Sequence, residues 1–596
     1  MDGSPILTEY QKKLEEAERA LVKVRDRQAT ALTTLLAVCG LTLGLGWMAW
    51  KEKAFPAWYP LLPLPVIFYC VRRYTRGYGE SSQAARLVDW RASGVARLNG
   101  AWVGKGYAGA EFDDADHVFQ RDLDLFGEGR LFELLATART AIGRRRLAEY
   151  LTRHVALEEA LERQNAVSEL RPMAELREKI GLLGRFEAQE SNRETFDRWF
   201  AMPVMKAPAV VRLVALVSTA VCVTSALLGL AMVLPWSLVV LIVLLCVPVN
   251  CGLGLAYQQD VRRVVEALQP VGVEISVFRE GLELLQGSEF QSAKLRHIVE
   301  TLRQAGAAGS IRRIERMIVW LNERNKDWFY GPSMFLLYAT QMTMAIEVWR
   351  ASHQDAMRAW LDGWAEFEVL NALAGYAYEH PGDPFPELVG GGPVFEGASL
   401  GHPLLAEDIC VRNDVALPGP GSFYVVSGSN MAGKSTFLRT IGINSVLAMA
   451  GAPVRARRLR LSGLRVCASI SVGDSLLNRR SKFLAEVERL KLTLEHARSG
   501  EPVLFLIDEI FSGTNSHDRG IAAEAVVKAL TGYGAIGALS THDLALTAMA
   551  DETLGRNVHM GSRDGTDPMD FDYVVKPGVT EESNALAIAR MAGVPI

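Results

Sequence analysis

Four long stretches without a charged residue stand out in the first half of the chain. Residues 29–50 and 54–71 form one pair, and residues 213–233 and 235–257 form a second pair. About 20 apolar residues in a helix cover the ~30 Å hydrocarbon core of a bilayer, and buried core helices seldom run this long without a charge. The pattern therefore predicts two transmembrane helical hairpins, although the 54–71 stretch contains four prolines.

Basic residues beside these stretches predict the orientation of both hairpins. Lys and Arg gather before the first stretch and after the second and fourth, whereas the turn inside the first pair holds only Lys51 and Lys53. Because positive residues stay on the cytoplasmic side, both hairpins should enter from the cytoplasm and return to it. A cleavable signal peptide is the alternative for residues 29–50, but such peptides have a shorter apolar region. We expect a multi-pass protein of the cell (inner) membrane with a cytoplasmic C-terminal domain.

Between and after the hairpins the pattern indicates soluble helices. Apolar residues recur at helical spacing over residues 119–190 and about 261–378, with breaks near 306–309 and 331–332. We expect the tryptophans of the second segment to pack in a core rather than stack on bases: Trp320, Trp328, Trp349, Trp360 and Trp364. The predicted organisation is a cytosolic helix (1–28), hairpin 1 (29–76), a first helical core (77–207), hairpin 2 (208–257), a helical lever or clamp region (258–380) and a C-terminal domain (381–596).

Composition limits the partners and metals that the chain can take. The formal net charge is −4, and residues 258–371 carry 13 Lys and Arg against 15 Asp and Glu, a poor surface for following nucleic-acid phosphates. None of the seven cysteines forms a CxxC pair, so we expect neither a zinc site nor a disulfide framework. This cysteine pattern fits a reducing compartment.

The strongest chemical signal begins at residue 423. A β-rich run, Phe423-Tyr-Val-Val-Ser427, leads into Gly428-Ser-Asn-Met-Ala-Gly433-Lys434-Ser435, and a helical pattern follows to residue 450. A strand, a GxxxxGK[ST] loop and a helix in this order predict a P-loop, whose backbone N–H groups hold phosphates. The predicted ATP-binding residues are Gly428, Ser429, Asn430, Met431, Ala432, Gly433, Lys434, Ser435 and Thr436.

Two further strand ends complete a predicted ATPase site. The apolar run 503–507 ends in Asp508-Glu509, and a β-run over 535–540 ends in Thr541-His542. Polar residues at the carboxyl ends of parallel strands face the ligand site of an α/β sheet. We assign Mg²⁺ to Ser435 and Asp508, water activation to Glu509, and γ-phosphate contacts to Lys434 and His542.

These motifs resemble the ATPase of the MutS mismatch-repair family, a branch of the ABC-type ATPases. The likeness covers roughly residues 120–200 and 360–596, and it includes His402-Pro403 before the P-loop and Asn430-Met431 within it. In that family, the segment resembling Ser481-Lys-Phe483-Leu-Ala-Glu486 helps to complete the partner subunit's site. The resemblance therefore implies a homodimer with shared ATP and Mg²⁺ sites, and it assigns Ser481, Asn515 and Asp518 to the site of the partner subunit.

The chain also departs from the family. The mismatch-reading and connector domains have no room here, because a hairpin takes their place at the N-terminus. Phe126-Gly-Glu128 matches the family's Phe-x-Glu wedge only as a tripeptide, and it lies beside the lever core. Mismatch recognition is therefore not carried over from the resemblance.

We expect an α/β P-loop (ABC-type) ATPase domain at the C-terminus, preceded by an all-α lever and core region that transmembrane helical hairpins interrupt. The expected function is that of a membrane-anchored, homodimeric MutS-like ATPase, with the lipid bilayer as a partner, acting on mismatched or branched DNA near the membrane. Two alternatives stay open: an ATP-switched scaffold for a protein partner, and an ATP-driven transporter or remodeller.

Overall fold

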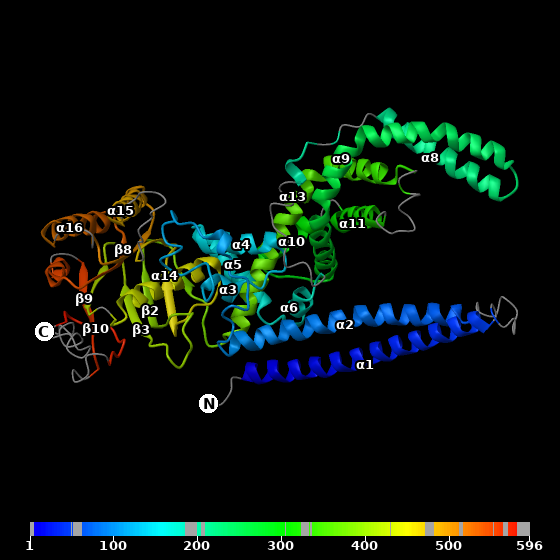
Figure 1. Cartoon of the computed structure of the whole chain (residues 1–596). Coiled ribbons are helices and arrows are strands. Elements are labelled where there is room, and N and C mark those ends of the chain that lie inside the picture. The colour runs from blue at the N-terminus through cyan, green and yellow to red at the C-terminus, as the bar shows by residue number, and fades with distance from the viewer. Residues whose placement is uncertain are drawn as a thin grey trace, which may run out of the picture.

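The chain folds into an elongated molecule with an α/β domain at one end and two helical hairpins at the other (Figure 1). A computed structural model describes residues 5–580 except 49–50, 52–61, 185–198, 204, 206–208, 304–305, 324–332, 334–335, 430, 471–481, 512–515, 552–553 and 564–569. A helical body lies between the α/β domain and the hairpins (Figure 1).

The first hairpin consists of α1 (Pro5–Trp47) and α2 (Leu64–Leu98), which run antiparallel (Figure 1). The predicted cytosolic helix and the first apolar stretch form one continuous helix, because a change from polar to apolar side chains does not interrupt backbone hydrogen bonding. Part of the 54–71 stretch lies outside the described residues, and its remainder begins α2. Two ion pairs attach α2 to the body, Arg91 to Glu178 at 3.1 Å and Arg97 to Glu379 at 2.6 Å.

The second hairpin consists of α8 (Ala209–Leu230) and the 51-residue α9 (Trp236–Gln286). Here too the predicted boundary at residue 257 lies inside a helix, so α9 carries the apolar stretch directly into the helical body. Among the described residues, α1, α8 and α9 are long and apolar enough to cross a membrane, judged by length and composition alone. The apolar parts of both hairpins project toward the same end of the molecule (Figure 1).

The helical body is built around α13 (Tyr338–Glu379), which packs against α9 and against most of the shorter helices. These are η3 (Ala110–Phe112), α3 (Leu131–Leu135), α4 (Ala141–Thr152), α5 (Leu157–Leu170), α6 (Ala174–Gly181), α10 (Ala293–Arg303) and α11 (Ala307–Glu323). Trp349, Trp360 and Trp364 are buried in this core as expected, whereas Trp320 is exposed and Trp328 lies outside the described residues.

The buried carboxylate of Glu368 on α13 accepts hydrogen bonds from the backbone N–H groups of Arg139 and Thr140, and so connects α13 to the start of α4. Burial raises the pKa of Glu368, although these hydrogen bonds oppose the shift. The structure thereby ties the segment before α4 to the central helix.

The C-terminal domain contains two sheets. The larger has the strand order β10-β9-β4-β8-β7-β6, in which only β10 (Lys576–Pro577) is antiparallel to its neighbour. Its other strands are β4 (Phe423–Gly428), β6 (Arg465–Ser469), β7 (Val503–Asp508), β8 (Ile536–Thr541) and β9 (Gly555–Met560). The smaller sheet, in the order β1-β5-β2-β3, combines β1 (Glu387–Leu388), β2 (Phe395–Leu400), β3 (Asn413–Leu417) and β5 (Arg458–Leu461).

Helices cover both faces of the larger sheet. Alternate residues of β4, β7 and β8 pack with α14 (Lys434–Ala450) on one face, and the residues between them pack with α15 (Lys482–Arg498) and α16 (Ser516–Gly532) on the other. This burial on two sides explains why these strands read as continuous apolar runs in the sequence. The short η6 (Leu544–Thr547) and α17 (Ala548–Asp551) lead from β8 to β9.

Candidate nucleotide-binding site

A glycine-rich loop joins the end of β4 to the start of α14. Gly428 has φ 144°, and a Cβ there would lie 2.3 Å from the carbonyl oxygen of Met560, so only glycine fits. Gly433, with φ 97°, precedes the first residue of α14. Met431 also has positive φ, 87°, and its side chain is exposed. Successive backbone turns of this kind before a helix N-terminus form a cradle for anions.

Lys434 is the first residue of α14 and is buried. Its ammonium group donates hydrogen bonds to the carbonyl oxygens of Gly428 at 2.8 Å and Ser429 at 2.9 Å. Burial lowers the pKa of Lys434, while the nearby carboxylates of Asp508 and Glu509 act to raise it. A desolvated cation is therefore held within the loop.

The carboxylate of Asp508 lies at the carboxyl end of β7 and accepts two hydroxyl hydrogen bonds. Ser435, on α14, donates to one oxygen, and Ser540, on β8, donates to the other. Asp508 and Ser540 are direct partners in the β7–β8 ladder, so sheet register brings them together. The structure thus joins the two predicted metal-binding residues and adds Ser540, which the sequence analysis missed because a serine within a strand carries no local signal.

Glu509 and His542 follow β7 and β8, respectively, and their side chains meet. The Nδ1 atom of His542 lies 3.3 Å from Oε1 of Glu509, and the Glu509 N–H donates to the carbonyl oxygen of Ser540 at 3.1 Å. Glu509 has φ 51°, a left-handed conformation that non-glycine residues adopt at a cost of about 1–3 kcal/mol and that clusters at functional sites. Lys434, Ser435, Asp508, Glu509 and His542 therefore gather at one edge of the sheet.

A cavity of about 660 Å³ opens beside these groups. Glycine-loop residues, Asp508 and Glu509 form its polar part, and its apolar lining includes Leu405, Ile409, Val411, Met560 and Tyr573. His402 also lines the cavity, and desolvation lowers its pKa to about 4, so its ring is neutral at physiological pH. The cavity combines an anion cradle with an apolar wall.

Two buried acidic residues outside the cavity connect segments around the site. Glu486 on α15 is buried and accepts a 2.5 Å hydrogen bond from the N–H of Phe511, just after Glu509. The resemblance assigns the Glu486 segment to the partner subunit's site, whereas this contact lies within one chain. Asp122 is fully buried, pairs with Arg489 at 2.5 Å and accepts from the N–H of Ile470, so it fastens the segment before α3 to the α/β domain.

The remaining predicted residues fall elsewhere. Ala432 is buried in the loop and Thr436 lines the cavity, whereas Asn430, Ser481 and Asn515 lie outside the described residues. Asp518 is exposed in the first turn of α16. Phe126 is buried against Phe132, with ring centroids 5.3 Å apart, which agrees with its exclusion as a base-contacting wedge.

Comparisons with known proteins concern the same part of the chain. Residues 424–596 match MutS domain V. The chain is 33% identical over 236 residues to the DNA mismatch repair protein MutS of Natronomonas pharaonis, covering 39% of this chain and 27% of that protein. It is 33% identical over 254 residues to MutS of Thermus aquaticus, covering 41% and 30%. A DNA mismatch repair protein MutS 2 of Halobacterium salinarum is 32% identical over 253 residues, covering 41% and 28%.

The alignments span less than a third of the length of these relatives. They bear on the C-terminal domain, where the glycine loop and the strand-end carboxylates lie. Over residues 424–596, the chain is therefore similar to the MutS family.

Proposed function

We propose that this protein is a membrane-anchored ATPase that works as a homodimer. The observation that carries the ATPase proposal is the meeting of Lys434, Ser435, Asp508 and Glu509 around one cavity at the carboxyl edge of a parallel sheet. An anion cradle, a hydroxyl–carboxylate pair and a second carboxylate are the groups that hydrolysis of a nucleoside triphosphate requires.

The residues present fit Mg²⁺ and ATP. Mg²⁺ in nucleotide sites takes one or two protein oxygens together with waters and phosphate oxygens, and the contact between Ser435 and Asp508 supplies such oxygens. In place of the two loop carbonyls that it now contacts, the Lys434 ammonium would donate to phosphate. The apolar wall near Ile409 and Tyr573 gives the base a surface to pack on.

Glu509 is the group best placed to accept a proton from the attacking water. It directly follows Asp508, and part of its side chain is solvent-accessible. His542, at hydrogen-bonding distance from Glu509, would orient this carboxylate and contact the γ-phosphate. The Mg²⁺ would supply charge neutralisation at the phosphates, while the chain's own residues position the water.

The homodimer proposal is supported by the position of one residue outside the cavity. Asp518 is exposed on α16 and is not among the residues that line the cavity. Together with the family resemblance, this placement suits a residue that acts on the neighbouring subunit's nucleotide, across a two-fold interface.

Mixing two inactive variants tests for shared sites. Lys434→Ala chains and Asp518→Lys chains should each be inactive alone, and an equal mixture should recover about a quarter of wild-type turnover, because half of the dimers then contain one intact site. Steady-state ATP hydrolysis over a series of mixing ratios measures this recovery. Absence of recovery at every ratio would indicate a self-sufficient subunit, provided that differently tagged variants co-purify and so are known to exchange subunits.

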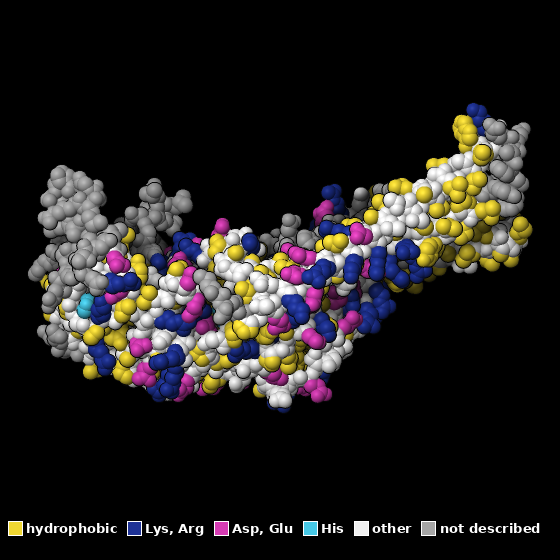
Figure 2. Space-filling view, turned by 90° about the horizontal axis from the view of Figure 1, so that it is seen from below, with side chains coloured by type: hydrophobic (Ala, Val, Ile, Leu, Met, Phe, Trp, Pro, Cys, Tyr) yellow, Lys and Arg dark blue, Asp and Glu magenta, His cyan; other side chains and the backbone are white. Residues whose placement is uncertain are grey.

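Membrane insertion is supported by the surface of the hairpins. Large apolar side chains stand exposed along α1, α8 and α9, including Leu43, Leu227 and Leu245, and such continuous apolar surface is rarely left in water. Figure 2 shows this apolar extension with a band of Lys and Arg at its base. Exposed Lys and Arg residues flank the apolar stretches on α1 and α2: Lys23, Arg25, Arg27, Arg72, Arg73 and Arg76. Basic residues in this position favour anionic lipid and the cytoplasmic face.

Cysteine labelling tests the proposed topology. Lys51→Cys and Met232→Cys place thiols at the two hairpin turns, and both should react with an impermeant thiol reagent added to sealed cells, whereas native Cys410 should react only after lysis. Cys467 cannot report on topology by thiol labelling, because burial raises the pKa of its thiol to about 12. Labelling of Cys410 in sealed cells would show that the orientation is opposite to the proposed one. Release of the protein from membranes by alkaline carbonate would show that the hairpins are not inserted in the bilayer.

DNA is proposed as a substrate because the similar proteins are DNA mismatch repair proteins. Binding of branched DNA to the detergent-solubilised chain, measured over a range of salt concentrations, distinguishes this substrate from a protein partner of an ATP-switched scaffold, because phosphate contacts weaken steeply with salt.

A further inference from the structure

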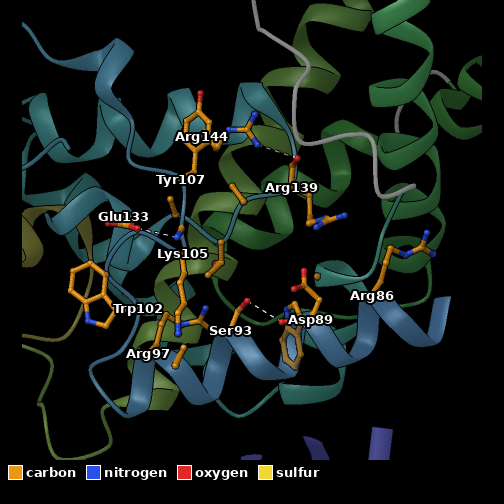
Figure 3. Close-up of a pocket in the computed structure, with 17 residues that line it drawn as sticks. Arg86, Asp89, Ser93, Arg97, Trp102, Lys105, Tyr107, Glu133, Arg139 and Arg144 are labelled. Atoms are coloured by element: carbon orange, nitrogen blue, oxygen red, sulfur yellow. Dashed lines mark hydrogen bonds between the residues drawn. The ribbon is translucent and has the colours of Figure 1, made fainter. Parts of the chain in front are cut away.

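A second cavity, of about 290 Å³, lies between α2, the segment around residues 102–107 and the start of α4 (Figure 3). Its lining contains five cationic side chains and two carboxylates. The cations are Arg86, Arg97, Lys105, Arg139 and Arg144, and the carboxylates are Asp89 and Glu133. In Figure 3, Arg86 and Arg139 lie on one side of the cavity and Arg97 and Lys105 on the other.

The five cations of the lining outnumber its two carboxylates. Glu133 is buried and accepts backbone hydrogen bonds from Gly106 at 2.9 Å and Gly129 at 2.7 Å, one on each oxygen. Asp89 is exposed to solvent. Of the five cations, Arg97 pairs with Glu379 outside the cavity. The structure shows no ion-pair partner for the other four among the residues that it describes.

Two of the arginines make contacts with neutral groups. Arg139 donates to the carbonyl oxygen of Leu183 at 3.1 and 3.3 Å. Arg144 is buried, with its guanidinium 4.4 Å from the centroid of the Tyr107 ring. The Nε atom of Arg86 is buried without a hydrogen-bond partner in the described part of the chain.

The electrostatic consequence is a desolvated surplus of positive charge. Burial lowers the pKa of Arg139, and the neighbouring Arg86 and Arg144 act in the same direction, while the carboxylates of Glu368 and Asp89 oppose the shift. Buried charges are ordinarily paired, because leaving one unpaired is costly. A bound anion would remove this cost.

We infer that this cavity binds the phosphate group of a small phosphorylated molecule. Guanidinium groups match the geometry of phosphate oxygens and form charge-assisted hydrogen bonds with them, and three such groups suit a doubly charged phosphate better than a single carboxylate. The volume is near the lower limit of about 300 Å³ for small-molecule pockets. Trp90, Trp102 and Tyr107 also line the cavity and supply apolar surface for the rest of the ligand.

The position of the cavity links two parts of the molecule. One wall is α2, which continues into the hairpin, and another includes Arg144 on α4, which packs against α14, the helix that follows the glycine loop. The phosphate could belong to a soluble molecule or to a lipid headgroup, and the experiment separates these sources. Phosphate binding in this cavity does not require ATP hydrolysis.

The test measures phosphate binding by full-length protein in lipid nanodiscs, with Lys434→Ala present to remove phosphate binding at the glycine loop. Inorganic phosphate should raise the melting temperature in phosphatidylcholine discs if the source is soluble. Phosphatidic acid in the discs should raise it instead if the source is a headgroup. If inorganic phosphate or phosphatidic acid raises the melting temperature and this effect requires Arg86, the result supports the phosphate site. If neither ligand changes the melting temperature, the proposal is overturned.

Arg86→Gln separates a binding role from a structural one. It should weaken the affinity for phosphate by about tenfold or more, the loss expected for a charge-assisted hydrogen bond, and Arg86→Lys should retain part of it. Because Arg86 adds to like-charge repulsion, Arg86→Gln should leave the ligand-free melting temperature unchanged or raised. Arg153→Gln, at an exposed position after α4, is the control and should behave as the parent. A lowered ligand-free melting temperature with unchanged phosphate affinity would assign Arg86 to the fold alone.

Discussion

Lys434→Ala should reduce the affinity for ATP by about a hundredfold or more. The ammonium now donates to two loop carbonyls and would donate to phosphate instead, and charge-assisted hydrogen bonds contribute about 1.5–3 kcal/mol each. Within the described residues, no other lysine or arginine lines the 660 Å³ cavity, so no neighbour can replace it. Equilibrium binding of a fluorescent ATP analogue to the solubilised protein measures the loss.

The matched control for this variant is Lys491→Ala. Lys491 lies in the same domain on α15, with its side chain largely exposed and only a 3.7 Å contact to Glu495, so its removal should leave ATP affinity unchanged. The melting temperature without nucleotide shows whether Lys434→Ala is folded. A folded Lys434→Ala protein with parental affinity would contradict the assignment of the glycine loop as the phosphate site.

Glu509→Gln should bind ATP with near-parental affinity but turn it over about 10² to 10⁴ times more slowly. Glutamine has the shape of glutamate without its basicity, so it can hold the water but cannot accept its proton. Because Glu509 is not part of the Ser435–Asp508 pair, Mg²⁺-dependent binding should persist. Single-turnover hydrolysis separates the chemical step from nucleotide binding and product release.

Glu495→Gln provides the corresponding control, since Glu495 is an exposed partner of Lys491 on α15 and should not affect turnover. If Glu509→Gln hydrolyses ATP at the parental rate, another group activates the water, and His542 becomes the first residue to substitute. Loss of ATP binding in Glu509→Gln would instead assign Glu509 to the nucleotide pocket.

Much of the C-terminal site was predictable because its signals are local in the sequence. The glycine loop, the apolar run ending in Asp508 and the second strand ending in His542 each lie within about ten residues. Parallel strands direct their carboxyl ends to one edge, so a correct strand assignment already implies that these ends meet. The structure shows that they do, with Ser435 on Asp508 and His542 beside Glu509.

Other features depended on contacts that no local pattern encodes. Ser540 reaches Asp508 only through the register of β8 on β7, and Asp122 reaches Arg489 across 367 positions of sequence. Glu486 accepts a hydrogen bond from the N–H of Phe511, which lies 25 positions further along the chain. In each case, the packing of segments that lie apart in the sequence determined which group the side chain contacts.

For the apolar stretches and the cationic cavity, too, some features follow from the sequence and others only from the tertiary structure. The sequence by itself determined where apolar surface is concentrated, since a run of uncharged residues is visible without a fold. Only the tertiary structure decided that α1 and α9 run unbroken past the predicted boundaries, because a change between polar and apolar side chains does not interrupt backbone hydrogen bonding. It also decided that Arg86 of α2 and Arg144 of α4 line one cavity, because long-range packing places side chains that are far apart along the chain.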